Sequence, residues 1–373
     1  MMISRKNLLL VSLIILLIAF ISLNREKTIK IAFVGTLSEH WSQLAIESRD
    51  GFMIAVDDIN KNGGVLGKEI EVLYYDDRND LDHAKSLKSK FKDDGVKLVS
   101  GFHISQMKEA VDYIMSNNDD ILFVSPTMNS HTLLGIDDNL ILMMSSANQQ
   151  IPPIVEAMLS NHVDTLMILY DTTNYGFSVP FANSLKNYAL EKNIDVLPLV
   201  EFNLEHEKNN KLLNHITNNN PDGIYFVANA IDTAELTQMI RNAGIKSLFF
   251  APSWSDKSTL IEHAGNSLDN TYITGYFDKF NKSIEYIAFE EKYIERYGYR
   301  PSYSSMYGYH SMLVLAEAME KSRSTNPLKV KEAILDIGTF NGLQDSFSID
   351  QYGDATGKIY LYRIDNGKFH YAK

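Results

Sequence analysis

The chain has 373 residues, which suffices for two domains, and its 45% hydrophobic and 22% charged content is typical of a folded globular protein. The formal net charge of -12 argues against nucleic acid or an anionic membrane surface as a partner of the folded part. There is no cysteine, which excludes disulfides, thiolate metal sites, a cysteine nucleophile and lipid attachment through a lipobox cysteine.

The N-terminal segment carries an export pattern. Arg5 and Lys6 precede an apolar run over residues 8–23, and charged residues follow at 25–27. At about 16 residues, the run lies between a signal-peptide core and a short membrane span. No small-x-small cleavage site is convincing. We therefore expect an exported protein, periplasmic or extracytoplasmic, whose residues 1–27 are either cleaved or kept as an inner-membrane anchor.

The next stretch predicts a strand–helix–strand unit. A strand is expected at 29–34, and a helix follows because Phe52, Ala55, Val56 and Ile59 share one face at helical spacing. Asn62-Gly63-Gly64 should end that helix, since glycine enters the left-handed conformation without steric cost. Residues 69–75 alternate and then become apolar, which predicts a buried strand closed by the pair Asp76-Asp77.

This unit resembles the opening of the type I periplasmic binding proteins, in the branched-chain amino acid and amide (Leu/Ile/Val-binding-like) class of ABC-transporter solute-binding proteins. Residues 55–77, AVDDINKNGGVLGKEIEVLYYDD, match the family's A-x-[DE]-x-[IL]-N helix, its GG-[VI]-x-G turn and its strand ending in DD. Residues 347–369, FSIDQYGDATGKIYLYRIDNGKF, are similar to the family's terminal F-x-[FI]-D-x-x-GD strand, polar turn and final strand. Together the matches cover nearly all of 28–373.

Strands and helices alternate regularly through the middle of the chain. We expect strands at 96–100, 121–125, 165–170, 195–202, 223–227 and 247–251, and helices at 81–93, 106–117, 179–192 and 233–243. Two such series predict an α/β protein with two doubly wound, Rossmann-like lobes. Their junction is placed at 145–153, where two adjacent prolines would stop a crossing element.

Helices at 284–297, 306–321 and 328–335, and a hairpin from 347–350 to 358–364, complete the prediction. The resemblance implies that the chain returns to the first lobe and then ends in the second, through a multi-crossover hinge with a ligand cleft between the lobes. The expected division is 28–147 with 276–340 for lobe 1, and 148–275 with 341–373 for lobe 2.

Candidate binding residues follow from the rule that ligands of open parallel α/β sheets bind beyond the C-terminal ends of the strands. The expected ligand-binding residues are Trp41, Ser105, Thr127, Met128, Asn129, Tyr175, Asn229, Asp232, Ser253 and Trp254. For a single serine or asparagine, turn chemistry or N-capping is an equally good interpretation. For either tryptophan alone, core packing is as good an interpretation as binding.

The resemblance implies roles for some of these positions. In the family, the position of Ser105 binds the ligand carboxylate, and the tyrosine matching Tyr175 packs on the ligand from the second lobe. Relatives often have a glutamate where this chain has Ser253, and that glutamate pairs with the ligand ammonium. A buried ammonium without a carboxylate partner is costly. Either Asp232 or Asp256 therefore takes that role, or the ligand has no ammonium group.

No catalytic or cofactor motif stands in the sequence: there is no G-x-S-x-G elbow, P-loop, G-x-G-x-x-G turn after a strand, or His/Asp/Glu cluster at metal spacing. The favoured hypothesis is a non-enzymatic, cofactor-free receptor that captures an amino acid, amide or related carboxylate by lobe closure and delivers it to an ABC permease. One alternative is a ligand-sensing component that signals to a membrane sensor. A two-lobed carbohydrate-active enzyme is less favoured.

Overall fold

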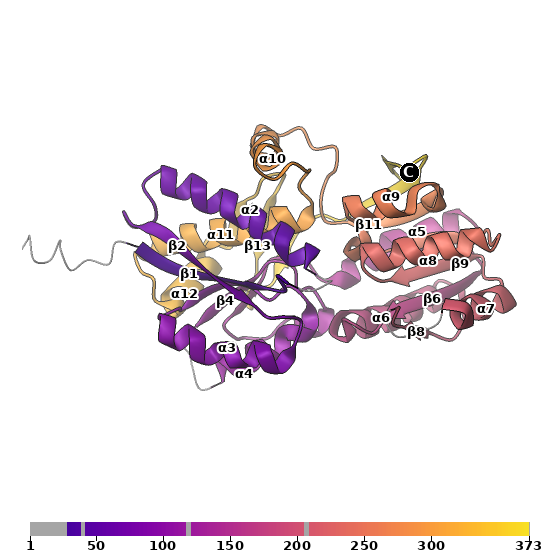
Figure 1. Cartoon of the computed structure of the whole chain (residues 1–373), viewed down its shortest axis with the longest axis horizontal. Helices are drawn as coiled ribbons and strands as arrows, with labels where there is room; N and C mark the ends of the chain where they lie inside the picture. Colours follow the sequence, from indigo (N-terminus) through magenta and orange to yellow (C-terminus); the bar gives the residue numbers. More distant parts are fainter. Residues whose placement is uncertain (1–27, 39–41, 117–120, 205–208, 373) are drawn as a thin grey trace, which may run out of the picture.

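The computed structural model describes residues 28–372 except 39–41, 117–120 and 205–208, and it consists of two α/β lobes side by side (Figure 1). The first lobe is built on a five-stranded sheet, and the second on an eight-stranded sheet. In each lobe helices cover both faces of the sheet (Figure 1). The predicted pair of doubly wound lobes is therefore confirmed.

The first sheet is entirely parallel, in the order β2-β1-β3-β4-β5. Its strands are β1 Thr28–Gly35, β2 Glu69–Asp76, β3 Leu98–Gly101, β4 Leu122–Ser125 and β5 Leu140–Leu142. Successive side chains of β1 alternate between the two faces, as a period of two requires: Ile31 and Phe33 join one core, and Ala32 and Val34 the other. β2 lies at the sheet edge with Tyr74 about half exposed, so the expectation of a buried strand is wrong there.

Within the described ranges, six helices cover the first sheet. One face packs against α2 Gln43–Lys61, α10 Ile284–Tyr297, α11 Tyr303–Ser322 and α12 Pro327–Ile337. The other face packs against α3 Leu81–Asp94 and α4 Lys108–Met115, and the 3-10 turn η1 Ser105–Met107 leads into α4. The predicted end of α2 is confirmed, because Asn62 is its C-cap and both Gly63 and Gly64 have positive φ.

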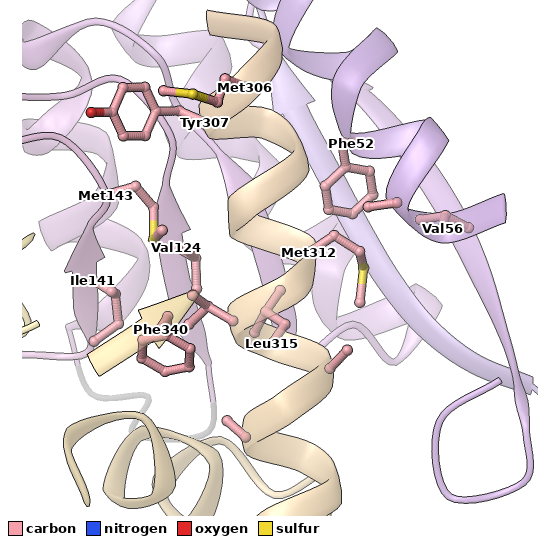
Figure 2. Close-up of a cluster of buried hydrophobic side chains, with 14 of the residues drawn as sticks. Phe52, Val56, Val124, Ile141, Met143, Met306, Tyr307, Met312, Leu315 and Phe340 are labelled. Carbon is pink, nitrogen blue, oxygen red and sulfur yellow. The ribbon is translucent and has the colours of Figure 1, made fainter. Parts of the chain in front are cut away.

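The helices α2 and α11 form the centre of this lobe. Figure 2 shows Phe52 and Val56 of α2 facing the side of α11 that carries Met312, while Leu315 meets the sheet residue Val124. The two backbones approach so closely that a Cβ added at Gly308 would lie 2.0 Å from the Ser48 carbonyl oxygen. Glycine at this crossing is therefore a packing requirement.

Replacing that glycine by Gly308→Ala should lower the free energy of unfolding by about 1–3 kcal/mol or more, because backbone atoms have to move apart. Urea unfolding followed by circular dichroism measures this. Gly357→Ala is the matched control, since its Cβ would meet nothing nearer than 3.6 Å, and it should change stability by less than about 0.5 kcal/mol. Equal effects of the two substitutions would contradict the packing account.

The second sheet has the strand order β16-β15-β11-β10-β9-β6-β7, and β8 also pairs with β6. The strands from β11 to β8 pair in parallel, while β15 and β16 at one edge pair antiparallel. Its strands are β6 Thr165–Asp171, β7 Asp195–Val196, β8 Val200–Phe202, β9 Gly223–Val227, β10 Leu248–Ala251, β11 Thr271–Gly275, β15 Tyr360–Asp365 and β16 Lys368–Tyr371. One face packs against α5 Ile151–Ser160 and α6 Tyr175–Glu191, and the other against α7 Asn209–Asn219, α8 Ala230–Asn242 and α9 Ser258–Ala264.

The predicted C-terminal hairpin is wrong. After the turn in which Asp350 Oδ1 accepts hydrogen bonds from the backbone N–H groups of Tyr352 and Asp354, the chain pairs back at once as β14 Ala355–Thr356. The result is a three-stranded sheet with β12 Thr339–Asn341 and β13 Ser346–Ile349. β15 instead pairs with β11 and β16. The predicted strand at 195–202 is likewise divided into β7 and β8.

Residues 341–356 were expected in lobe 2, yet β13 packs on the first-lobe core through Phe347 and Ile349. The chain therefore passes between the sheets after β5, after β11 and after β14. Tyr276 lies in the second crossover segment, and Ser146 and Gln150 lie in the first. The Tyr276 hydroxyl donates to the Ser146 carbonyl (3.1 Å) and accepts from Gln150 Nε2 (3.1 Å). Gly357 lies in the third crossover segment, and its N–H donates to Ser145 Oγ in the first (2.5 Å). Hydrogen bonds thus tie the three crossovers together.

Candidate ligand-binding cleft

The strand-end loops of the two lobes enclose two adjoining chambers. The larger has an empty volume of about 620 Å³, part of it open to solvent, and the smaller about 310 Å³. Leu44 and His103 of the first lobe and Asn174 and Trp254 of the second line both chambers. The candidate site is therefore one continuous cleft with walls from both lobes.

Six of the predicted residues line this cleft. Ser105, Thr127, Asn129 and Ser253 line the smaller chamber, Asn229 lines the larger, and Trp254 lines both. Several of these side chains also make structural hydrogen bonds, in keeping with the N-capping interpretation given for single serines and asparagines. Asn229 is the N-cap of α8, and its Oδ1 accepts the N–H groups of Ile231 and Asp232. Asn129 Nδ2 donates to the Tyr276 hydroxyl at 3.2 Å.

Three predicted residues lie elsewhere, and Trp41 is outside the described residues. Met128 is fully buried in the first-lobe core, while Asp232 is buried in the first turn of α8. Tyr175 is the first residue of α6 and is about half exposed. The neighbours of Tyr175 are instead at the cleft: Asn174 lines it, and Gly176 lies against the backbone of Ser105 and Gln106 in the first lobe.

The aspartate pair that ends β2 holds the cleft loop that follows β1. Asp77 Oδ1 accepts the Thr36 hydroxyl (2.6 Å), and Asp76 accepts the Leu37 N–H (3.0 Å) and the Ser38 hydroxyl. Burial raises the pKa of Asp77, with partial offset from Thr36. Burial also acts on Asp76, but the hydrogen bonds outweigh it and lower the pKa of Asp76. The aspartate pair of the family motif thus positions one wall of the site.

His103 and Asn174 bring unpartnered polar atoms to the cleft. Within the part of the chain that the structure describes, neither ring nitrogen of His103 nor Oδ1 of Asn174 makes a well-formed hydrogen bond, although both residues are buried and the Val34 backbone is near enough to act on the imidazole. Burial and the nearby charge of Lys257 lower the pKa of His103 to about 3, so its imidazole is neutral and offers one donor and one acceptor. Buried polar groups without partners are rare and costly. The cleft therefore presents hydrogen-bonding capacity that a solute can use.

A buried ion pair joins the two lobes beside the larger chamber. Lys257 belongs to the loop after β10 in the second lobe, and Glu47 lies on α2 of the first lobe. Lys257 Nζ is 2.6 Å from Glu47 Oε2, and both residues are less than 5% exposed. Glu47 also accepts the hydroxyls of Ser302 and Ser304 at the start of α11. Burial acts to raise the pKa of Glu47, but the Lys257 charge and these hydrogen bonds outweigh it and lower that pKa.

Sequence reasoning missed both partners of this ion pair. A signal for Glu47 existed, because residues 44, 47, 48 and 51 share one face of α2 at helical spacing, which places a carboxylate on the buried side. Lys257 stands three residues after Trp254 in the same strand-end loop. An additional contact between the lobes runs from the Thr259 hydroxyl to Gln43 Oε1 at 3.1 Å. The two lobes thus touch across the cleft.

Because the ion pair is buried, we expect a single substitution to destabilise the protein much more than substitution of both partners. Lys257→Met should lower the free energy of unfolding by about 3–5 kcal/mol, because it leaves the Glu47 charge buried and unpaired. Glu47→Gln combined with Lys257→Met should restore much of that loss. Lys292→Met, which breaks the half-exposed pair with Asp58, is the control and should cost about 1 kcal/mol or less. Denaturant unfolding measures all three, and a double variant as unstable as Lys257→Met would refute the pairing argument.

The depressed pKa of His103 predicts a pH dependence of stability. The folded protein keeps this imidazole neutral down to about pH 3, while the unfolded chain takes up a proton below about 6.5. Acidification from pH 6.5 to 5 therefore favours unfolding by about 1.4 kcal/mol per pH unit from this residue. His103→Asn should reduce the slope of unfolding free energy against pH by about that amount. The control His370→Asn, at an exposed position, should leave the slope unchanged.

Among the described residues, no group of three or more histidine, aspartate or glutamate side chains is arranged to hold a metal ion. Within the same residues, no helix has the length and apolar character needed to cross a membrane. The predicted anchor at 8–23 lies outside them.

A two-lobed α/β fold with a cleft between strand-end loops defines the class of the protein as a bilobal solute receptor. Residues 28–368 match the family model described as periplasmic binding protein, so the chain belongs to that family. This confirms the resemblance that the sequence motifs carried, and the family implies an extracytoplasmic location.

Individual relatives agree with this family. A leucine-, isoleucine-, valine-, threonine- and alanine-binding protein of Pseudomonas aeruginosa is 25% identical over 334 residues, which cover 88% of this chain and 87% of the relative. The crystal structure of a leucine-binding protein from Thermotoga maritima has a TM-score of 0.84 at 23% identity, and the match covers 92% of this chain and 98% of that one. A solute-binding protein of an ABC transporter from R. palustris, in complex with benzoate, has a TM-score of 0.82 at 15% identity, with 92% and 95% covered.

Proposed function

We propose that this chain is an extracytoplasmic receptor that captures a small solute between its lobes and delivers it to an ABC importer. The observation that carries the proposal is a single cleft walled by strand-end loops of both lobes. Polar atoms of His103 in one lobe and Asn174 in the other are unpartnered there among the residues that the structure describes. A solute that contacts both lobes favours the closed arrangement, because those contacts are made together only there. An importer can then recognise the closed lobe pair.

The ligand class under this proposal is an amino acid, an amide or a related small carboxylate. The P. aeruginosa relative is named for aliphatic amino acids, and the R. palustris structure contains benzoate. Apolar and aromatic side chains supply much of the wall in this chain. Trp254 meets Phe177 edge to face, with ring centroids 5.4 Å apart, and Leu44, Met144 and Tyr303 line the same chamber. These walls suit an aliphatic or aromatic body that carries one polar head.

The proposal includes the lobe division and the fate of the N-terminus. The sheet pairing supports lobe 1 as residues 28–147 with 276–356, and lobe 2 as 148–275 with 357–373, which moves the expected boundary from 340 to 356. The apolar run at 8–23 supports export, with the segment either cleaved or retained as an inner-membrane anchor. We propose a binding role without catalysis, in keeping with the relatives, which are named as binding proteins.

A thermal-shift screen tests this function. Amino acids, amides, short aliphatic acids and aromatic acids are added to the purified protein, and a true ligand at 100 times its dissociation constant should add about 2.7 kcal/mol of stability. If no compound in these classes stabilises the protein, the proposed ligand class is wrong.

The site is tested with the ligand found in that screen. Ser105→Ala with Trp254→Ala should weaken binding at least about tenfold, since both side chains line the cleft. Calorimetric titration gives the affinity. The control is Ser89→Ala with Tyr113→Ala, which likewise removes a serine hydroxyl and an aromatic ring, here from exposed positions on α3 and α4. Unchanged affinity in the cleft variant would overturn the site assignment.

A further inference from the structure

We infer that the solute is a small monocarboxylate without an ammonium group, and that Lys257 is the residue that selects it. The inference rests on the proposed function and narrows its ligand class. It depends on three features of the cleft: a buried cation with a spare donor, a neutral imidazole beside it, and the engagement of the neighbouring carboxylates by other groups.

Lys257 provides the cation. It lines the larger chamber and is 4% exposed, and its ammonium has three N–H donors. One donates to Glu47 Oε2 (2.6 Å) and one to Ser304 Oγ (3.0 Å). The ammonium also lies 5.2 Å from the centre of the Tyr303 ring. We assign its third N–H to a carboxylate oxygen of the solute, because Lys257 lines the chamber. Because Lys257 is itself almost fully buried, a charge-assisted hydrogen bond that it forms is stronger than one on the surface.

His103 stands close enough to Lys257 to sense its charge, since that charge contributes to the depressed pKa of the imidazole. The ring is therefore neutral, and its N–H donates without adding a second buried charge. Its two nitrogens and Asn174 Oδ1 are unpartnered within the described residues. A carboxylate that accepts from Lys257 and His103 would give the buried imidazole the partner that it lacks.

The two aspartates considered from the sequence as ammonium partners line neither chamber. Asp232 Oδ2 accepts Asn229 Nδ2 at 2.8 Å. Asp256 is 1% exposed, its Oδ1 lies 2.5 Å from Lys279 Nζ, and its Oδ2 faces Gly275. Among the described residues that line either chamber, the charged side chain is Lys257, and position 253 carries a hydroxyl. A ligand ammonium would therefore lose its hydration without gaining a carboxylate partner from the chamber lining, because the nearby Glu47 is already paired with Lys257.

The test compares compounds that share one carbon skeleton. The full-length protein is titrated calorimetrically with L-leucine, 4-methylpentanoate and 4-methylpentanamide, and with L-phenylalanine, 3-phenylpropanoate and 3-phenylpropanamide. In the series that binds, the acid should bind at least tenfold more tightly than its amino acid and its amide. An amino acid or amide that binds as tightly as the acid overturns the inference and leaves the proposed function intact. Binding by neither series overturns it as well, and the broad screen then decides the proposed function separately.

Substitutions test the assigned role of Lys257 in the same series. Glu47→Gln with Lys257→Met removes the pair without stranding a charge, and it should reduce affinity for the acid at least tenfold while the affinity for the amide changes less than threefold. Ser253→Asp places a carboxylate in the smaller chamber and should shift the preference from acid toward amino acid. The control Ser89→Asp adds the same charge on the exposed face of α3 and should leave the preference unchanged. An acid preference that survives in the Glu47→Gln, Lys257→Met protein overturns the role of Lys257.

Discussion

The buried contact between Glu47 and Lys257 is the interaction on which the arrangement of the lobes depends. Its two charges come from different lobes and lie 2.6 Å apart with almost no exposure. Removing two ions from water costs several kcal/mol each, and their attraction repays that cost only when the geometry is good and other hydrogen bonds complete the shell. Ser302 and Ser304 supply those hydrogen bonds to Glu47. By this balance we expect the pair to contribute little net stability, while it joins one residue of each lobe at a fixed point of contact.

This constraint changes what a solute has to provide. A ligand shifts a conformational equilibrium by the difference in its affinity for the two states. In this structure protein groups already join the lobes across the cleft, through the ion pair and the hydrogen bond from Thr259 to Gln43. The solute needs to add only the remainder, through the open polar atoms of His103 and Asn174. A small ligand with a single polar head can meet that requirement.

Local patterns predicted most of the fold but less of the site. The alternating side chains of β1 and the glycines after α2 were sufficient to predict that strand and the end of that helix, because both features depend on residues close in sequence. The prediction of the C-terminal hairpin was wrong because Asp350 stabilises a turn after which the chain pairs with β13 as β14. Which strands pair there depends on tertiary contacts and not on the local sequence. Lys257 was missed for a related reason, since its partner stands 210 residues away on another lobe.

The Tyr175-Gly176 pair shows how a motif can mark a site through an unexpected residue. The tyrosine was the predicted contact, yet it begins α6 and points about half into solvent. The glycine makes the closer approach: a Cβ at Gly176 would lie 2.7 Å from the Gln106 nitrogen of the first lobe. A side chain there would hold the lobes apart, since that distance is well below van der Waals contact. The residue type at 176 is therefore dictated by lobe contact, and it positions Asn174, two residues earlier, against the chamber that Lys257 and His103 share.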